Sequence, residues 1–158
     1  MKVNSVAARA AIGLASAVLT TMAIVPAAHA EPQYIEQATV TYGYTVPFGS
    51  VSEFCTGKAF IGQLSTNQIE AYSESICTGF MLFNSTETWI RPEPNTLESL
   101  ANNMSTCSLG PSEPCTSVTA ATSIPGGPPG TQYCVTGFGN ASTGEDHLGS
   151  GGVCITTR

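Results

Sequence analysis

The chain has 158 residues, with 11 acidic and 5 basic side chains and a formal charge of −6 at pH 7. Its first 30 residues read as a secretion signal, which leaves enough chain for one domain. In residues 31–158, three basic residues, Lys58, Arg91 and Arg158, face all eleven acids. This argues against a nucleic-acid partner or an anionic membrane surface, because phosphate binding needs a cluster of Lys and Arg.

The first 30 residues carry the parts of a signal peptide in the usual order. Lys2 and Arg9 form a basic start, residues 10–25 are an apolar stretch, and Ala28 and Ala30 supply the small residues at the cleavage site. Sixteen apolar residues are fewer than the roughly 20 that span a bilayer. We therefore expect residues 1–30 to be removed and residues 31–158 to form one β-rich secreted, extracellular domain without membrane insertion. Few lysines and an alanine-rich signal indicate a bacterial origin.

The alternation of apolar and polar residues, together with turn signals, predicts several strands along the chain. From Val40 to Phe48, an apolar or aromatic residue stands at every second position, which is typical of a half-buried strand. Residues 51–64 indicate a second strand, and residues 68–83 favour strand structure over a helix, so that the segments around Cys55 and Cys77 would form a hairpin. Further strands are expected over residues 116–124, 132–138 and 153–157, with turns or loops over 107–115, 125–130 and 139–152.

One short helix is expected near residues 96–104. Asn95 can cap it, Glu98 follows three residues later, and apolar residues at positions 97, 100, 101 and 104 follow the spacing of one helix face. Short strands divided by Gly and Pro turns dominate the rest of the chain. The expected fold is therefore all-β, a single disulfide-stapled antiparallel sandwich or small barrel with this one helix.

All six cysteines lie after residue 30, and an even count behind a signal peptide indicates disulfides formed in an oxidising compartment. Six cysteines allow fifteen pairings, and sequence does not choose among them. Pairing between cysteines close in sequence is the simplest hypothesis, and no C-x-x-C motif suggests metal or redox chemistry instead. The pairs would be Cys55 with Cys77, Cys107 with Cys115, and Cys134 with Cys154.

Catalytic and metal-binding residues are scarce. His147 is the only histidine after residue 30, and it lies in a segment expected to be a polar loop tip. No G-x-S-x-G motif identifies a nucleophile for it to activate. Asn140, Glu145 and Asp146 offer oxygen atoms to calcium, but their spacing does not match a calcium loop. We therefore name no catalytic residue and expect no metal and no cofactor.

Four aromatic residues, Tyr42, Tyr44, Phe48 and Trp89, are assigned to the core rather than to an exposed platform for stacking sugars. The alternation of Tyr42 and Tyr44 with small polar residues is typical of one face turned inward. A surface that binds partners is then expected in the loops.

The candidate binding loop comprises Leu109, Gly110 and Pro111 between Cys107 and Cys115, because proline and a disulfide lower the entropic cost of binding. The function expected from the sequence is a secreted, non-enzymatic protein that binds an extracellular protein or glycan, with enzyme inhibition as the more concrete version. The alternatives are a small extracellular hydrolase with His147 as base and a structural protein of the cell envelope.

Overall fold

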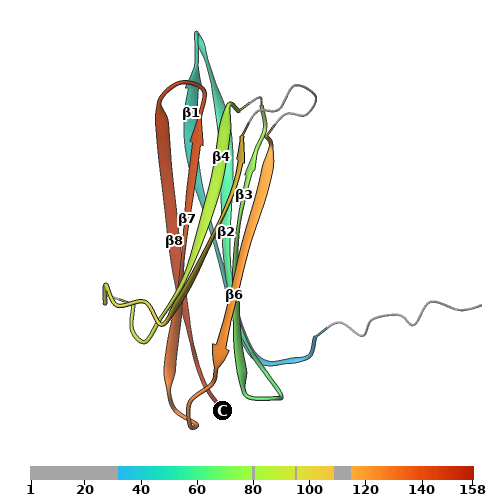
Figure 1. Ribbon diagram of the computed structural model, residues 1–158, viewed down its shortest axis with the longest axis vertical. Coiled ribbons are helices and arrows are strands. Elements are labelled where there is room, and N and C mark those ends of the chain that lie inside the picture. Colours follow the sequence, from blue (N-terminus) through green and yellow to red (C-terminus); the bar gives the residue numbers. More distant parts are fainter. Residues whose placement is uncertain (1–31, 80, 95, 109–114) are drawn as a thin grey trace, which may run out of the picture. The chain divides into compact units, whose positions relative to one another are not determined.

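The computed structural model describes residues 32–79, 81–94, 96–108 and 115–158. Eight antiparallel strands make up this part of the chain, and it contains no helix. They are β1 (Tyr34–Phe48), β2 (Val51–Leu64), β3 (Gln68–Cys77), β4 (Phe83–Arg91), β5 (Ala101–Ser108), β6 (Ser117–Pro125), β7 (Gln132–Ser142) and β8 (Asp146–Thr156) (Figure 1).

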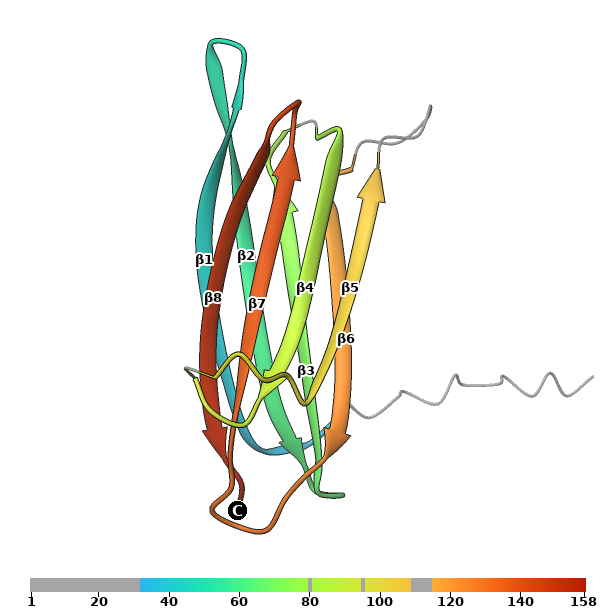
Figure 2. The ribbon, with the colours of Figure 1, turned by 60° about the vertical axis from the view of Figure 1, so that its left-hand side comes forward.

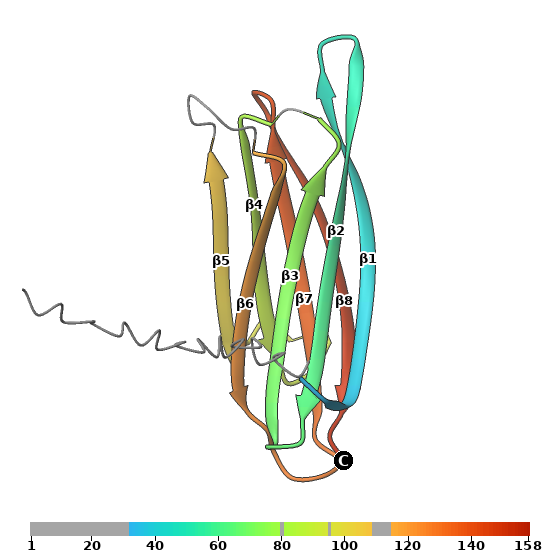
Figure 3. The ribbon, with the colours of Figure 1, turned by 90° about the vertical axis from the view of Figure 1, so that its right-hand side faces the viewer.

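The strands form two four-stranded sheets that pack face to face. Sheet A has the order β1-β2-β3-β6, and sheet B has the order β5-β4-β7-β8. β1 lies beside β8 on one side of the sandwich, and β5 lies beside β6 on the other (Figures 2 and 3). The all-β sandwich expected from the sequence is therefore confirmed.

The interior between the sheets contains two apolar clusters. One cluster is built around Ile61, Ile69, Ile90 and Val135, and the other around Val46 and Met81 with the disulfide of Cys55. At about 25 cal/mol per Å² of apolar surface removed from water, these side chains supply the main driving force for folding.

A layer of hydroxyl and amide side chains lies in the interior as well, and it links the sheets by hydrogen bonds. Tyr44 Oη and Ser75 Oγ are 2.7 Å apart, and Ser75 Oγ donates to Asn84 Oδ1 at 2.8 Å. Ser73 Oγ is hydrogen-bonded to Thr88, whose own Oγ1 donates to Ala120 O. Satisfied buried polar groups of this kind fix the register of the two sheets.

Glycines in sheet B make room for the tyrosines of β1. A Cβ atom built on Gly151 would lie 2.6 Å from Tyr42 Cδ1, and one on Gly149 would lie 2.4 Å from Tyr44 Cδ1. Tyr44 is buried and Tyr42 is partly buried, so the assignment of these two rings to the core is confirmed. The side chain of Phe48 lies outside the described residues.

The expectation of a helix near residues 96–104 is wrong. The chain runs as a connection from Pro92 to Leu100 and then as strand β5, which pairs along its length with β4. The proposed apolar face has nothing to pack against, since Leu97 is 87% and Met104 is 62% exposed. Asn95, the proposed cap, lies outside the described residues.

The expected long loop over residues 139–152 is also wrong. β7 continues to Ser142 and β8 begins at Asp146, so the connection is only three residues long. His147 is therefore part of β8, paired with Ala141 of β7, rather than at a loop tip. Three of the glycines that suggested a loop, Gly139, Gly149 and Gly151, are strand residues that lie against the rings of Tyr44 and Tyr42.

The three disulfides join the cysteines that are close in sequence: Cys55–Cys77, Cys107–Cys115 and Cys134–Cys154. The first and third join directly opposed residues of neighbouring strands. Each closes a loop of about 20 residues, which stabilises the fold by on the order of 3 kcal/mol in the chain-entropy model. Three disulfides indicate an oxidising or extracellular environment.

Candidate functional site

A row of aromatic rings crosses the outer face of sheet A, from β1 over β2 to β3. It consists of Tyr34, Phe60 and Tyr72. Alternation along β2 and β3 places Phe60 and Tyr72 on the outer face, directly opposite each other in the register. A register shift between Tyr34 and Glu36 lets Tyr34 join them.

The three rings pack against one another. Phe60 and Tyr72 stack with their centroids 5.0 Å apart, and Tyr34 meets Phe60 edge to face at the same distance. Tyr34 lies flat over Gly62, where a Cβ atom would come within 2.4 Å of its ring. Phe60 is thereby buried, whereas the two tyrosines stay partly exposed. The result is a preorganised aromatic edge with phenol groups at the surface.

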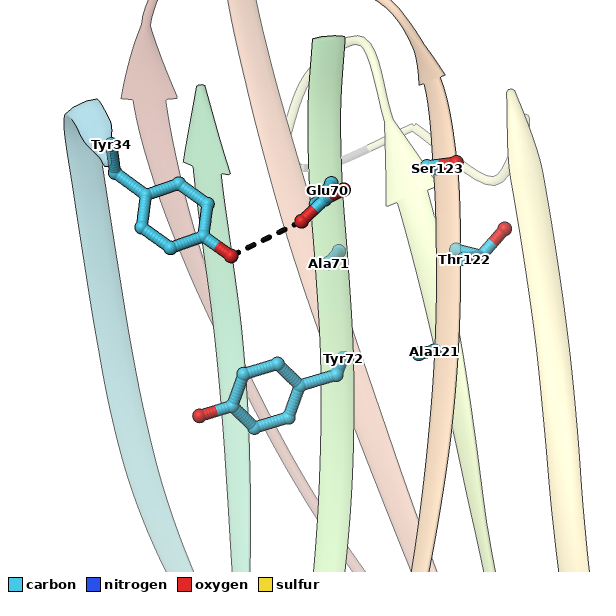
Figure 4. Close-up of a pocket in the computed structure, with 7 residues that line it drawn as sticks. All are labelled: Tyr34, Glu70, Ala71, Tyr72, Ala121, Thr122 and Ser123. Carbon is cyan, nitrogen blue, oxygen red and sulfur yellow. Dashed lines mark hydrogen bonds between the residues drawn. The ribbon is translucent and has the colours of Figure 1, made fainter. Parts of the chain in front are cut away.

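Charged side chains flank this row. Tyr34 Oη donates a hydrogen bond to Glu70 Oε2 at 3.1 Å (Figure 4). Burial together with this bond to a carboxylate raises the pKa of Tyr34 above its usual value of 10.0. Lys58 Nζ lies 5.4 Å from the centroid of the Tyr72 ring, within range of a cation–π interaction. The rings, one carboxylate and one ammonium group thus form a mixed polar and aromatic surface.

A hollow lies beside this surface, where β6 carries only small side chains. Its volume is about 240 Å³, and Figure 4 shows its lining. Tyr34, Glu70 and Tyr72 lie on one side of it, and Ala121 and Ser123 of β6 lie on the other. The hollow is smaller than the roughly 300–1,000 Å³ of sites for drug-sized ligands, so it suits one small ring.

A second hollow, of about 290 Å³, adjoins the first, and Ser123 contributes to the lining of both. It is lined as well by Thr66, Asn67 and Gln68 at the turn between β2 and β3, and by Ile124 and Pro125 of β6. We name the two hollows together the β3–β6 trough. Carboxylate, amide and hydroxyl groups line it along its length, next to the aromatic row.

The trough is lined mainly by strand residues, whereas the sequence pattern predicts a binding surface in the loops. Leu109, Gly110 and Pro111 lie outside the described residues, so the binding loop remains a prediction.

The expectation that Trp89 belongs to the core is wrong. Alternation along β4 places it on the outer face of sheet B, packed edge to face on Phe138. The reason is that β4 turns Asn84, Thr86 and Thr88 inward and its aromatic residues outward.

Within the described ranges, no group of three or more His, Cys, Asp or Glu side chains is arranged to hold a metal ion. No helix in the same part of the chain is long and apolar enough to cross a membrane.

The fold and the trough define the molecule as a disulfide-stapled β-sandwich with a hollowed, aromatic sheet face. Comparison with protein-family models, curated proteins and solved structures gives no match for the chain.

Proposed function

We propose that the chain is a secreted, non-enzymatic binding protein that holds a short oligosaccharide along the β3–β6 trough. The observation that carries the proposal is that two small hollows adjoin at Ser123, beside a preorganised aromatic row. An extended ligand built from repeating small rings fits two adjoining small hollows better than one compact molecule does.

The chemistry of the trough supports a sugar as the repeating unit. Sugars present C–H groups on one side and hydroxyl groups around the rim. The edge of Tyr72 offers apolar contact, while Glu70, Gln68 and Ser123 offer hydrogen-bond donors and acceptors to hydroxyl groups. Tyr is suited to such contacts because it gives a large, rigid, amphipathic surface at low entropic cost.

Secretion is part of the proposal. The order of basic, apolar and small residues over positions 1–30 supports export, and three disulfides support an oxidising destination. A bacterial extracellular protein of this kind would meet glycans of cell envelopes or of the surroundings.

Affinity electrophoresis tests the proposal. The purified protein is run through native gels that contain one soluble polysaccharide each, from a panel of glucans, mannans, arabinans and galactans. We expect at least one gel to retard the protein. Tyr72→Ala and Glu70→Gln remove the ring edge and the charge from the trough, and each should lose most of the retardation. Thr45→Ala, exposed on the same face of β1 outside the trough, should behave as the wild type.

If no polysaccharide of the panel retards the wild-type protein, or if Tyr72→Ala is retarded like the wild type, the trough is not a glycan site. If the same face binds a protein instead, the chain would capture that protein, and free oligosaccharide would not compete with it. The inhibitor and hydrolase alternatives rest on residues 109–111 and on His147, so neither depends on the trough.

A further inference from the structure

Arg91, the last residue of β4, is an unusual cation because it is buried. Its side chain and backbone together are only 8% exposed. Among the described residues, no carboxylate lies within ion-pair distance of it, and the ion pair found there joins Arg158 to Glu36 on another part of the surface. Burying a charge without an opposite charge is costly, and proteins usually avoid it.

The contacts of Arg91 hold its guanidinium in place but leave part of it unused. Nη1 donates to Thr96 O at 2.8 Å, and the group stacks over the Trp89 ring at 4.7 Å from its centroid. Phe138 lies beyond, with its centroid 6.0 Å away. Nε has no hydrogen-bond partner among the described residues. Nε is itself buried, so a carboxylate would approach the guanidinium through its outer nitrogens, Nη1 and Nη2, which also form a planar fork for two parallel hydrogen bonds.

A hollow adjoins this side chain on the outer face of sheet B. The connection between β4 and β5 runs across β7 and β8 (Figure 2), and Arg91 and Pro94 line a hollow of about 290 Å³ against these strands. Thr136 of β7 and Gly152 of β8 are opposite each other in the register and form part of the lining. The Cys134–Cys154 disulfide adds an apolar wall. We name this hollow the Arg91 pocket.

We propose that the Arg91 pocket binds a small organic carboxylate, with the guanidinium of Arg91 as its counter-charge. The carboxylate supplies the negative charge and the acceptor oxygens that the described residues do not give to Arg91. The apolar body of the ligand packs on Pro94 and the disulfide. The absence of a side chain at Gly152 leaves the space beside Thr136 open, since a Cβ on Gly152 would lie 3.5 Å from Thr136 Oγ1.

This site is independent of the glycan proposal, because the trough lies on sheet A and the Arg91 pocket on sheet B. The ligand class follows from three features together: a fixed planar cation, an apolar wall and a volume that admits one small ring. A bidentate arginine favours the planar carboxylate, and the apolar wall favours an organic acid over a bare inorganic ion.

The probes are benzoate and its uncharged counterpart benzamide, titrated into the full chain labelled with ¹⁵N. We expect saturable shifts of the Thr136, Ser150 and Gly152 amide signals with benzoate, and none with benzamide or inorganic phosphate. Benzoate should also raise the Tm of the wild type, because a ligand that binds only the folded state stabilises it.

Arg91→Met removes the charge at similar volume and should abolish both effects. Arg91→Lys keeps a cation but lacks the planar fork, so we expect at least tenfold weaker binding. Arg158→Gln removes an exposed cation elsewhere and should bind as the wild type does. The proposal is overturned if the wild type gives no saturable shifts with benzoate, if benzamide or phosphate gives equal shifts, or if Arg91→Lys binds as tightly as the wild type.

Discussion

The contact between Gly57 and the ring of Tyr42 gives a sharp test of the interior packing. A Cβ atom on Gly57 would lie 2.0 Å from Cε2 and 2.1 Å from Cζ of Tyr42. Ordinary contact distances begin near 3.4 Å, so the ring would have to retreat by more than an ångström. The backbone of Gly151 on the facing sheet blocks that movement, since the ring also lies over this residue.

Gly57→Ala should therefore be strongly destabilising. Overpacking a core costs typically 1–3 kcal/mol, and the blocked retreat favours the upper end, about 3 kcal/mol. In a domain of this size that corresponds to a fall in Tm of roughly 10 °C. Thermal unfolding followed by circular dichroism measures it.

Gly43→Ala is the matched control. A Cβ there would lie 2.6 Å from the tip of Phe54, but that ring is 48% exposed and free to turn away, so we expect little change. In the double variant Gly57→Ala with Tyr42→Ala, the penalty for the added methyl group should largely disappear. A Gly57→Ala protein with the Tm of the wild type would show that the ring is not confined in this way.

Three further predictions concern other parts of the molecule. Tyr42→Phe removes a buried hydroxyl that has no partner among the described residues, so Tm should stay equal or rise, whereas Tyr44→Phe loses the bond to Ser75 and should cost about 1 kcal/mol in urea unfolding. Burial raises the pKa of Tyr42 to about 12, so the folded state holds this proton more tightly than the unfolded state does. The free energy of unfolding should therefore be highest below pH 10 and fall from pH 10 to 12, and this fall should be smaller in Tyr42→Phe. Urea unfolding at each pH measures it. His147→Ala should leave any binding activity intact, and loss of a hydrolytic activity in this variant would instead support the hydrolase alternative.

The strands were predictable where alternation and cysteine spacing act together. Once Cys55 and Cys77 pair across a hairpin, antiparallel register places Phe60 opposite Tyr72, which is the pairing observed. Two of the three rings in the aromatic row therefore follow from the cysteine spacing together with the alternation along the two strands. Tyr34 could not be added in this way, because it reaches the outer face through a register shift that leaves no mark in the sequence.

The two wrong segments have physical explanations. The helical pattern over residues 97–104 is real, but pairing with β4 satisfies the backbone of β5, and local helix propensity is weaker than such tertiary pairing. The glycines of β8 suggested a loop because their role depends on Tyr42 and Tyr44, which lie about 100 residues earlier in the chain. Neither effect is visible in a local window.

The Arg91 pocket was not predictable from sequence for a related reason. In the sequence, Arg91 is one of three scattered cations after residue 30, and its burial depends on a connection that folds back over β7 and β8. Trp89 and Phe138 enclose it from two strands that are distant in sequence. Only the assembled sheet brings these groups together.

A map of amide chemical shifts, recorded with an oligosaccharide cut from a polysaccharide that retards the protein, tests directly whether the β3–β6 trough holds a glycan. We expect the shifts to concentrate along β3 and β6, on Gln68 to Tyr72 and on Ala121 to Pro125. Shifts concentrated instead on residues 109–111, or spread over sheet B with the β3–β6 trough silent, would contradict the proposal.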